Sequence, residues 1–239
     1  PVHLIRTIAY ALHYRNEDDP NSIKLTDDIK NNGLESALKA ATGLGEAPME
    51  KKLIDDIKAS YQQAAKEIDW RKKGKEAYDR GFEYETVYHG CGQCSYAAAS
   101  EILGCFDPEV FKAATGLCGG IGLKNNNTCS AFTGAVLVIG NLYNRRREHF
   151  DGDREAKYTN FALVQQLYDK FINEFGGITC AHVHTVKYGR PYDLSVKAES
   201  VAFEEAGGHG PHGCTDTVGK ACQFAIEVLA PMLMEKEEE

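Results

Sequence analysis

The stretch NTCSAFTGAVLVIGNLY, residues 127–143, joins a capping residue, a cysteine and a long apolar run. Asn127 or Thr128 can cap a helix that begins at Cys129, because their side-chain oxygens accept hydrogen bonds from free backbone N–H groups. The run could also hold a short buried strand over residues 136–139. Its length favours a helix that extends to residue 143. We therefore predict a buried helix with a cysteine at its start.

Three further cysteines, Cys94, Cys180 and Cys214, stand at or near the start of other helical segments, usually just after glycine or a capping residue. A helix start offers unpaired N–H groups and a partial positive charge, and both favour a thiolate over a thiol. Four such starts that face one point would form a metal–sulfur site. We therefore expect these three cysteines and Cys129 to lie close together in the folded chain.

Helical patterns extend over most of the chain. Apolar residues recur every three or four positions, which predicts helices over residues 49–70, 75–84, 161–175 and 218–229. Asp107 followed by Pro108 predicts another helix start, an N-cap with proline at the first helical position. No strand pattern repeats along the sequence. We predict an all-α protein: a compact helical domain over residues 75–239 with cysteines at helix N-termini, preceded by an N-terminal helical extension over residues 1–74.

The charge and hydropathy of the chain exclude two classes of function. The 239 residues include 35 acidic and 27 basic side chains, a formal net charge of −8, whereas a nucleic-acid scaffold needs a clustered basic surface. No stretch approaches the roughly 18 consecutive apolar residues of a membrane span. A cytoplasmic location is slightly favoured, and a periplasmic one requires that a signal segment was removed ahead of Pro1.

Eight cysteines are many for this length, yet 43% of the residues are hydrophobic, which is enough for an ordinary core. A small scaffold held by disulfides is therefore disfavoured, and metal binding or redox chemistry becomes the leading use of the cysteines. Cys105 and Cys222 are expected to be structural, because free cysteine packs as a small hydrophobic residue.

Cys91 and Cys94 form a Cys-x-x-Cys pair at a helix start, where they suit either two ligands of one metal or a reactive dithiol. Cys118 and Cys129 flank the glycine-rich turn over residues 116–122. Missing side chains there let backbone N–H groups approach a sulfide or an anion. We expect Cys129 to bind a cofactor. For Cys118 the sequence favours neither a role as a ligand nor that of an incidental cysteine.

Histidines near two of these cysteines are further candidates. His182 and His184 follow Cys180 on alternate sides of a helix, so at most one of them shares its face. His212 precedes Cys214 in a turn that contains glycine and proline, and it is a candidate extra metal ligand.

Several stretches, in order, resemble one known family. They are YHGCGQC (residues 88–94), FKAATGL (111–117), GGIG (119–122) and TCSAFTG (128–134). This order resembles the C-GCAxxG-C-C family, to which redox activity is assigned, and later pieces around Cys180, over residues 189–194 and at Cys214 agree with it. The resemblance covers about residues 75–230.

The resemblance implies a helical fold in which four cysteines are gathered for redox or metal work. By residue match these are Cys94, Cys129, Cys180 and Cys214. Thr128 and Ser130 depart from the family, where glycine and then alanine or glycine are usual, and this leaves the geometry of the turn before Cys129 open.

The expected cofactor is an iron–sulfur cluster with two or four irons, because soft thiolates suit such clusters and helix N-termini offset their negative charge. Structural zinc is an alternative, although zinc sites usually draw on two short-spaced pairs and one pair occurs here.

A dithiol–disulfide enzyme that uses Cys91 and Cys94 is a second alternative. The strand–helix–strand pattern that normally accompanies such a motif is not evident in the sequence. The chain is also loosely similar to split-Soret cytochromes c, which implies haem c, but covalent haem needs Cys-x-x-Cys-His and Ser95 follows Cys94.

Together these observations favour an electron carrier over an enzyme with an organic substrate. We expect a redox partner protein and no nucleic acid. A homodimer is also expected, since residues 1–74 supply amphipathic helices with no evident partner within the chain.

Overall fold

The computed structural model describes residues 69–235, which form one compact unit, Asp69–Glu235. The helix predicted over residues 49–70, and the extension over residues 1–74 on which the expected homodimer depends, lie outside the described residues except at 69–74. Regular structure within the described part is helical apart from one isolated β-bridge. The predicted all-α fold is therefore confirmed.

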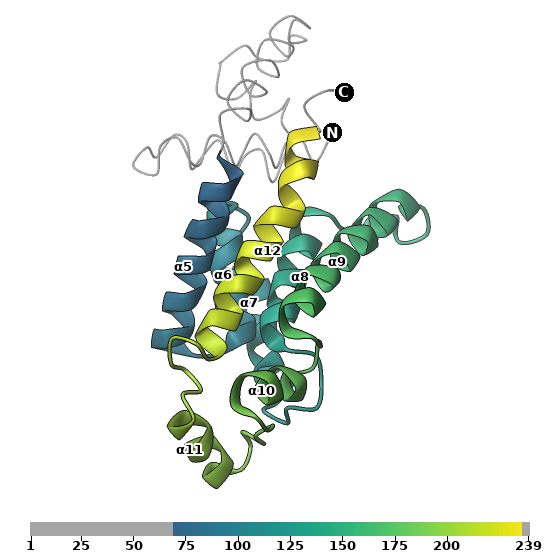
Figure 1. The fold of residues 1–239 in the computed structure, drawn as a ribbon. Helices are drawn as coiled ribbons and strands as arrows, with labels where there is room; N and C mark the ends of the chain where they lie inside the picture. Colours follow the sequence, from purple (N-terminus) through teal and green to yellow (C-terminus); the bar gives the residue numbers. More distant parts are fainter. Residues whose placement is uncertain (1–68, 236–239) are drawn as a thin grey trace, which may run out of the picture. The chain divides into compact units, whose positions relative to one another are not determined.

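Four helices form the body of this unit (Figure 1). They are α5 (Trp70–Tyr88), α6 (Cys91–Ile102), α8 (Ser130–Leu142) and α12 (Cys214–Glu235). α12 packs against the other three, and α6 packs against α5 and α8. A fifth long helix, α9 (Arg154–Phe175), packs against α8 and α12.

Shorter helices connect and close the body. α7 (Pro108–Ala113) and η1 (Ala114–Leu117) follow α6, and η2 (Arg147–His149) lies between α8 and α9. α10 (Cys180–Tyr188) and α11 (Lys197–Glu205) lie at the end of the body where α5 ends and α12 begins (Figure 1). Helix starts that carry cysteines are therefore collected at this end.

Glycines let the central helices approach closely. A Cβ atom on Gly134 of α8 would collide with the Ser95 Oγ and the Gly92 carbonyl oxygen of α6. A Cβ atom on Gly81 of α5 would lie 2.6 Å from the Cys222 Sγ of α12. The backbones of α6 and α8 therefore touch directly, and this contact fixes how far apart the cysteines at their starts can be.

Capping residues explain where several helices begin and end. The Asp107 side chain accepts a hydrogen bond from the Glu109 N–H at 2.8 Å, and Pro108 is the first residue of α7, as predicted. α9 and α10 end at Gly176 and Gly189, which adopt φ angles of 71° and 80°. Local sequence chemistry thus decides these boundaries.

One boundary differs clearly from the sequence predictions, and one helix was not predicted. α5 extends over Trp70–Tyr88 rather than 75–84, because the Asp69 carboxylate caps it by accepting the N–H groups of Arg71 and Lys72. The apolar run after Cys129 forms the helix α8, as predicted, and no strand. The helix that was not predicted is α11. Within the described residues, no helix is long and apolar enough to cross a membrane.

Candidate functional site

Four cysteines occupy the first positions of four helices or the residue before them. Cys91, Cys180 and Cys214 are the first residues of α6, α10 and α12, and Cys129 is the N-cap of α8. Cys94 lies one turn inside α6, where its N–H donates to the Gly90 carbonyl oxygen at 3.0 Å. The cysteine at the start of α6 is therefore Cys91 rather than Cys94.

A short backbone pairing brings the starts of α8 and α10 together. Thr128 and Thr179 form an antiparallel bridge. The Cys129 N–H donates to the Ile178 carbonyl oxygen at 2.8 Å, and the Cys180 N–H donates to the Asn127 carbonyl oxygen at 2.9 Å. Cys129 and Cys180 are consequently held beside each other by backbone hydrogen bonds, although they are distant in sequence.

The glycine-rich turn folds against these two helix starts. Gly119, Gly120 and Gly122 adopt φ angles of 59°, 67° and 60°, which only glycine accepts at little cost. A Cβ atom on Gly120 would lie 2.8 Å from the Cys180 Cβ. The turn can therefore approach Cys180 only because glycine occupies this position.

Ser130 fixes the turn to α8. Its buried hydroxyl accepts the Gly120 N–H at 3.1 Å and donates to the Leu117 carbonyl oxygen. The sequence left the geometry of this turn open because Thr128 and Ser130 depart from the family pattern. Both residues hold the turn in place, Ser130 through its side chain and Thr128 through the backbone bridge.

A cavity of about 160 Å³ lies between these elements. Five cysteines from five separate segments line it, and we refer to it as the cysteine cavity; they are Cys91, Cys118, Cys129, Cys180 and Cys214. The rest of the wall is largely apolar and includes Val183, Leu194 and Phe203. The structure thus brings three of the four expected cysteines, together with Cys91 and Cys118, around one partly open space.

The two remaining sequence candidates lie outside this wall. Cys94 is buried, and its thiol donates to the carbonyl oxygen of His89 at 3.1 Å. His89 is itself one of the residues that line the cavity. His212 is exposed, and its carbonyl oxygen accepts a hydrogen bond from Lys187 Nζ at 3.0 Å. The histidine that shares the face of Cys180 is His184, four residues along α10, and it lines the cavity.

Burial, rather than the helix starts, governs the ionisation of these thiols. Burial raises the pKa values of Cys94, Cys180 and Cys214, and it raises that of Cys129 to about 11 even though the N–H groups of Ala131 and Phe132 act in the opposite direction. In the protein alone, burial thus outweighs the effect by which a helix start favours a thiolate. A cation that binds here must displace protons from the thiols.

Cys118 differs from the other cavity cysteines. A hydrogen bond from the Cys91 thiol lowers the pKa of Cys118, and the same hydrogen bond, followed by burial, raises the pKa of Cys91. Cys91 and Cys118 are therefore a contacting pair, whereas the sequence pairs Cys91 with Cys94.

The comparison with protein families identifies the chain. A family model described as "Putative redox-active protein (C_GCAxxG_C_C)" matches residues 89–228, which is more than half of the sequence. The chain belongs to the C_GCAxxG_C_C family. Its role is accordingly a redox role. No solved structure matches the chain.

Within this C_GCAxxG_C_C protein, the matched region contains all five cavity cysteines. Cys222 also falls in it, but its buried Sγ donates to the Ser95 carbonyl oxygen at 3.5 Å in the middle of the helical body. Membership of the family therefore does not by itself separate structural cysteines from those of the site. The cysteines of the site are instead recognised because they line the cavity.

Sequence reasoning missed several ionisable residues of the cavity, among them Glu85 and His209. Glu85 is 2% exposed, and within the described residues its Oε2 has no hydrogen-bond partner. His209 places Nε2 3.7 Å from Glu85 Oε1 and Nδ1 2.7 Å from Glu204 Oε1. Burial lowers the pKa of His209, but the two carboxylates raise it more.

A signal for Glu85 was present in the sequence. Ala77, Gly81 and Glu85 recur every four residues, and all three are buried on one face of α5. His209 lies in the connection between α11 and α12, and no spacing in the sequence predicts its position.

The cavity cysteines surround a space rather than a point. Among residues 69–235, no three His, Cys, Asp or Glu side chains are placed to bind one metal ion together. A tetrahedral zinc site needs sulfurs about 2.3 Å from the metal, which sets them roughly 3.8 Å from one another. No preformed group of this geometry is found among the described residues.

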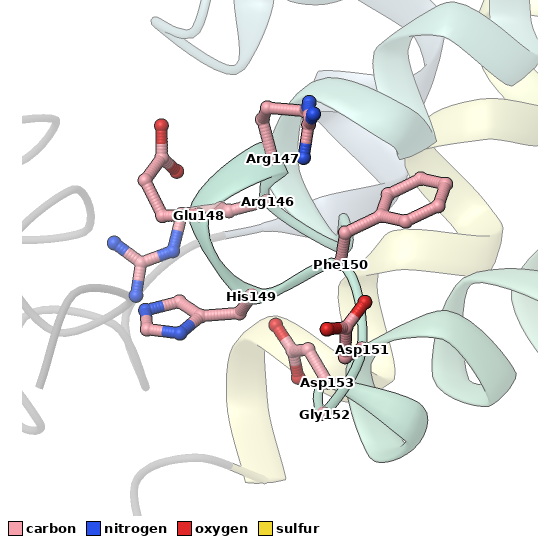
Figure 2. Close-up of a pocket in the computed structure, with 8 residues that line it drawn as sticks. All are labelled: Arg146, Arg147, Glu148, His149, Phe150, Asp151, Gly152 and Asp153. Atoms are coloured by element: carbon pink, nitrogen blue, oxygen red, sulfur yellow. The ribbon is translucent and has the colours of Figure 1, made fainter.

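A second hollow, of about 600 Å³, lies on the surface in the loop between α8 and α9 (Figure 2). A single run of residues, 146–153, lines it, and no cysteine belongs to it. Arg145 and Arg147 of this region lie over the Phe150 ring at 4.2 and 5.5 Å. Its side chains are mostly exposed, and nothing in it resembles the cysteine cavity.

Proposed function

We propose that this redox protein is an iron–sulfur electron carrier whose cluster is held by cysteines of the cysteine cavity. The observation that carries the proposal is the convergence of five cysteines from five segments on one partly open, largely apolar space of about 160 Å³. Thiolates are the ligands that iron–sulfur clusters require, and clusters commonly use four of them. The donor set of the cavity therefore fits the group.

The spread of the sulfurs favours a cluster over a single ion. Ligands of one zinc must converge within a little over 2 Å of it, and no three side chains among the described residues do so. A cluster has several metal atoms and therefore takes ligands that are further apart. The close approach of Gly120 to Cys180 leaves backbone rather than side chain next to the sulfurs, which suits inorganic sulfide.

Cys129, Cys180 and Cys214 are the ligands best supported, because each begins a helix and lines the cavity. Cys91 or Cys118, which also line the cavity, would supply a fourth thiolate. The donor count is compatible with either two or four irons.

A bound cluster would supply reversible one-electron transfer, and the chain's own residues define the conditions for it. The apolar wall limits water near the sulfurs, and the starts of α8, α10 and α12 place partial positive charge beside them. Both features would bias the potential at which an electron is accepted. No residue of the cavity forms a recognisable catalytic arrangement for an organic substrate, which is why we propose an electron carrier that serves a redox partner protein.

Anaerobic reconstitution with iron and sulfide tests the proposal. We expect bound iron and acid-labile sulfide in equal amounts, a visible absorption band and an EPR signal after reduction. Cys129→Ala should lose most of the iron, whereas Cys222→Ala, which removes a buried cysteine outside the cavity, should keep it. Protein without iron and sulfide after reconstitution, or colourless protein with one zinc per chain, would overturn the proposal.

The contact between Cys91 and Cys118 supports a second candidate, a thiol–disulfide protein. Their mutual hydrogen bond lowers the pKa of Cys118 and raises that of Cys91, which favours a single thiolate shared within the pair. Their oxidation to a disulfide would release two electrons and two protons to a disulfide acceptor. Mass spectrometry of the metal-free protein in a glutathione redox buffer distinguishes the candidates. A Cys91–Cys118 disulfide that forms and is reduced reversibly would favour the second.

A further inference from the structure

His184 lies at the centre of an aromatic cluster beside two cavity cysteines. It is 1% exposed and stacks on Phe203, with ring centroids 4.9 Å apart and an angle of 19° between the planes. Edge contacts with Tyr188 and Tyr192 surround the ring further. The imidazole is thus fixed in one orientation, and each ring nitrogen has a defined neighbour.

The Nδ1 side of the ring faces the amide of Asn125. This amide is buried, and its Nδ2 donates to the Tyr192 carbonyl oxygen at 2.7 Å and lies 3.2 Å from His184 Nδ1. A carbonyl oxygen only accepts, so the amide must present nitrogen rather than oxygen at this place. The second hydrogen of the same NH₂ group then points to Nδ1, and Nδ1 must be an acceptor.

A neutral imidazole with Nδ1 as the acceptor carries its proton on Nε2. A ring nitrogen that accepts a hydrogen bond carries no proton, so an acceptor at Nδ1 makes the ring of His184 neutral. The Nε2 atom lies 3.7 Å from Cys180 Sγ and 3.8 Å from Cys214 Sγ. One N–H group therefore faces two sulfurs.

Other donors near these sulfurs are already engaged. The backbone N–H groups of Cys180 and Cys214 donate to the carbonyl oxygens of Asn127 and Gly208. The Tyr188 hydroxyl has one hydrogen and two acceptors within reach, the Gly208 carbonyl oxygen at 3.0 Å and Cys214 Sγ at 3.7 Å, and the shorter contact is the one to the oxygen. His184 thus offers these sulfurs a hydrogen that the two backbone N–H groups do not, and it is the donor that lies near both of them.

The geometry points to His184 as a positioning residue that donates its Nε2–H to the sulfurs of Cys180 and Cys214 and does not bind metal itself. This role rests on the proposed function, because its consequence is a change in reduction potential. The sulfurs carry more negative charge after an electron is accepted, so a donor stabilises the reduced form more than the oxidised one. His184 should therefore raise the potential.

Nitrogen NMR of the metal-free protein tests the tautomer without any cluster. In ¹⁵N-histidine-labelled protein we expect a protonated Nε2 and an unprotonated Nδ1 for His184, assigned by the signals that His184→Phe removes. A proton on Nδ1 would overturn the inference. This measurement is independent of the proposed function.

Redox titration of reconstituted protein tests the consequence. His184→Phe keeps a ring to stack on Phe203 but has no N–H, and it should retain iron and shift the potential to a lower value. His184→Gln keeps an N–H near the position of Nε2, and its potential should return toward that of the wild type. Loss of iron or a changed EPR signal in both variants would show that His184 is a ligand, and equal potentials in all three proteins would exclude tuning. If no cluster forms at all, the proposed function fails and the tuning role fails with it, while the tautomer result stands alone.

Discussion

Cys222 in the helical body and Cys129 in the cysteine cavity are both buried, at 0% and 5% exposure, yet their surroundings differ completely. Cys222 fills the space left by Gly81 of the neighbouring helix, and its thiol has a carbonyl oxygen as its partner. Cys129 borders a cavity together with four other cysteines. Burial alone therefore says nothing about function, and what distinguishes the two cysteines is whether the space beside the sulfur is filled.

The two regions are also held together differently. In the body, small residues such as Ala98, Ala99 and Gly134 bring helix backbones into contact. Around the cavity, loop backbone and buried polar side chains make the connections, as in the Thr128–Thr179 bridge and the hydrogen bonds of Ser130. The body should therefore respond most to added volume, and the cavity region most to lost hydrogen bonds.

Gly134→Ala should have the largest effect. The new methyl group would collide with the Ser95 hydroxyl and the Gly92 carbonyl oxygen, and part of that clash is with backbone that cannot turn away. We expect the free energy of unfolding to fall by about 3 kcal/mol or more, with reduced iron uptake, because α6 and α8 must separate. Urea unfolding measures the loss.

Gly140→Ala is the matched control on the same helix, because a Cβ atom there meets nothing within 4 Å. It should leave stability unchanged or raise it by up to about 1 kcal/mol through helix propensity. Equal effects at Gly134 and Gly140 would contradict the close contact between α6 and α8.

Asp216→Asn should have the next largest effect. The Asp216 carboxylate accepts hydrogen bonds from Tyr78 of α5 at 2.8 Å and from Lys187 of α10 at 2.9 Å, and it is 15% exposed. Its loss leaves a largely buried lysine without its carboxylate, at a cost of about 2 kcal/mol by thermal or chemical unfolding. Asp79→Asn breaks an exposed pair with Lys75 and should cost no more than about 0.5 kcal/mol. A cost for Asp216→Asn as small as this would show that the pair does not hold α10 to the body.

Ser130→Ala tests the connection between the glycine-rich turn and α8. The change leaves the Gly120 N–H and the Leu117 carbonyl oxygen without their partner, and we expect a loss of about 1.5 kcal/mol. Iron bound per chain should fall as well, because Gly120 contacts Cys180. Ser195→Ala, at an exposed serine, should change neither quantity. Full iron binding by Ser130→Ala would mean that the turn does not shape the cavity.

Cys222→Ala should have the smallest effect. The sulfur is replaced by a small void beside Gly81, at a cost of about 1 kcal/mol, and iron content should match the wild type. Metal analysis alongside thermal unfolding checks both expectations. A loss of iron would place Cys222 in the site and remove the distinction between the two regions.

Much of the fold could be predicted from the sequence because it depends on local chemistry. The start of α7 at Asp107 and Pro108, and the ends of α9 and α10 at glycines, follow from capping rules. α11 could not be predicted, since Phe203 is its one buried residue and is buried through its stacking on His184. A contact between distant segments leaves no periodic pattern in a nine-residue helix.

The site was only partly predictable for a related reason. Helix starts with cysteines can be recognised locally, so Cys129, Cys180 and Cys214 were expected at one place. The ionisation of their thiols depends on burial, which the whole fold determines, and it opposes the local effect of the helix start. The position of His209 depends in the same way on the whole fold, and so does the contact of Cys91 with Cys118. Both are set by loops whose course no sequence motif specifies.

The wall of the cysteine cavity combines Glu85 from the first described helix with Cys214 from the last one. A chain emerging from the ribosome therefore lacks part of this wall until its C-terminal helix has been synthesised and has docked against α5, α6 and α8. Delivery of the proposed cluster would then follow translation, and a prematurely terminated chain that ends before residue 214 would expose its remaining thiols to oxidation instead.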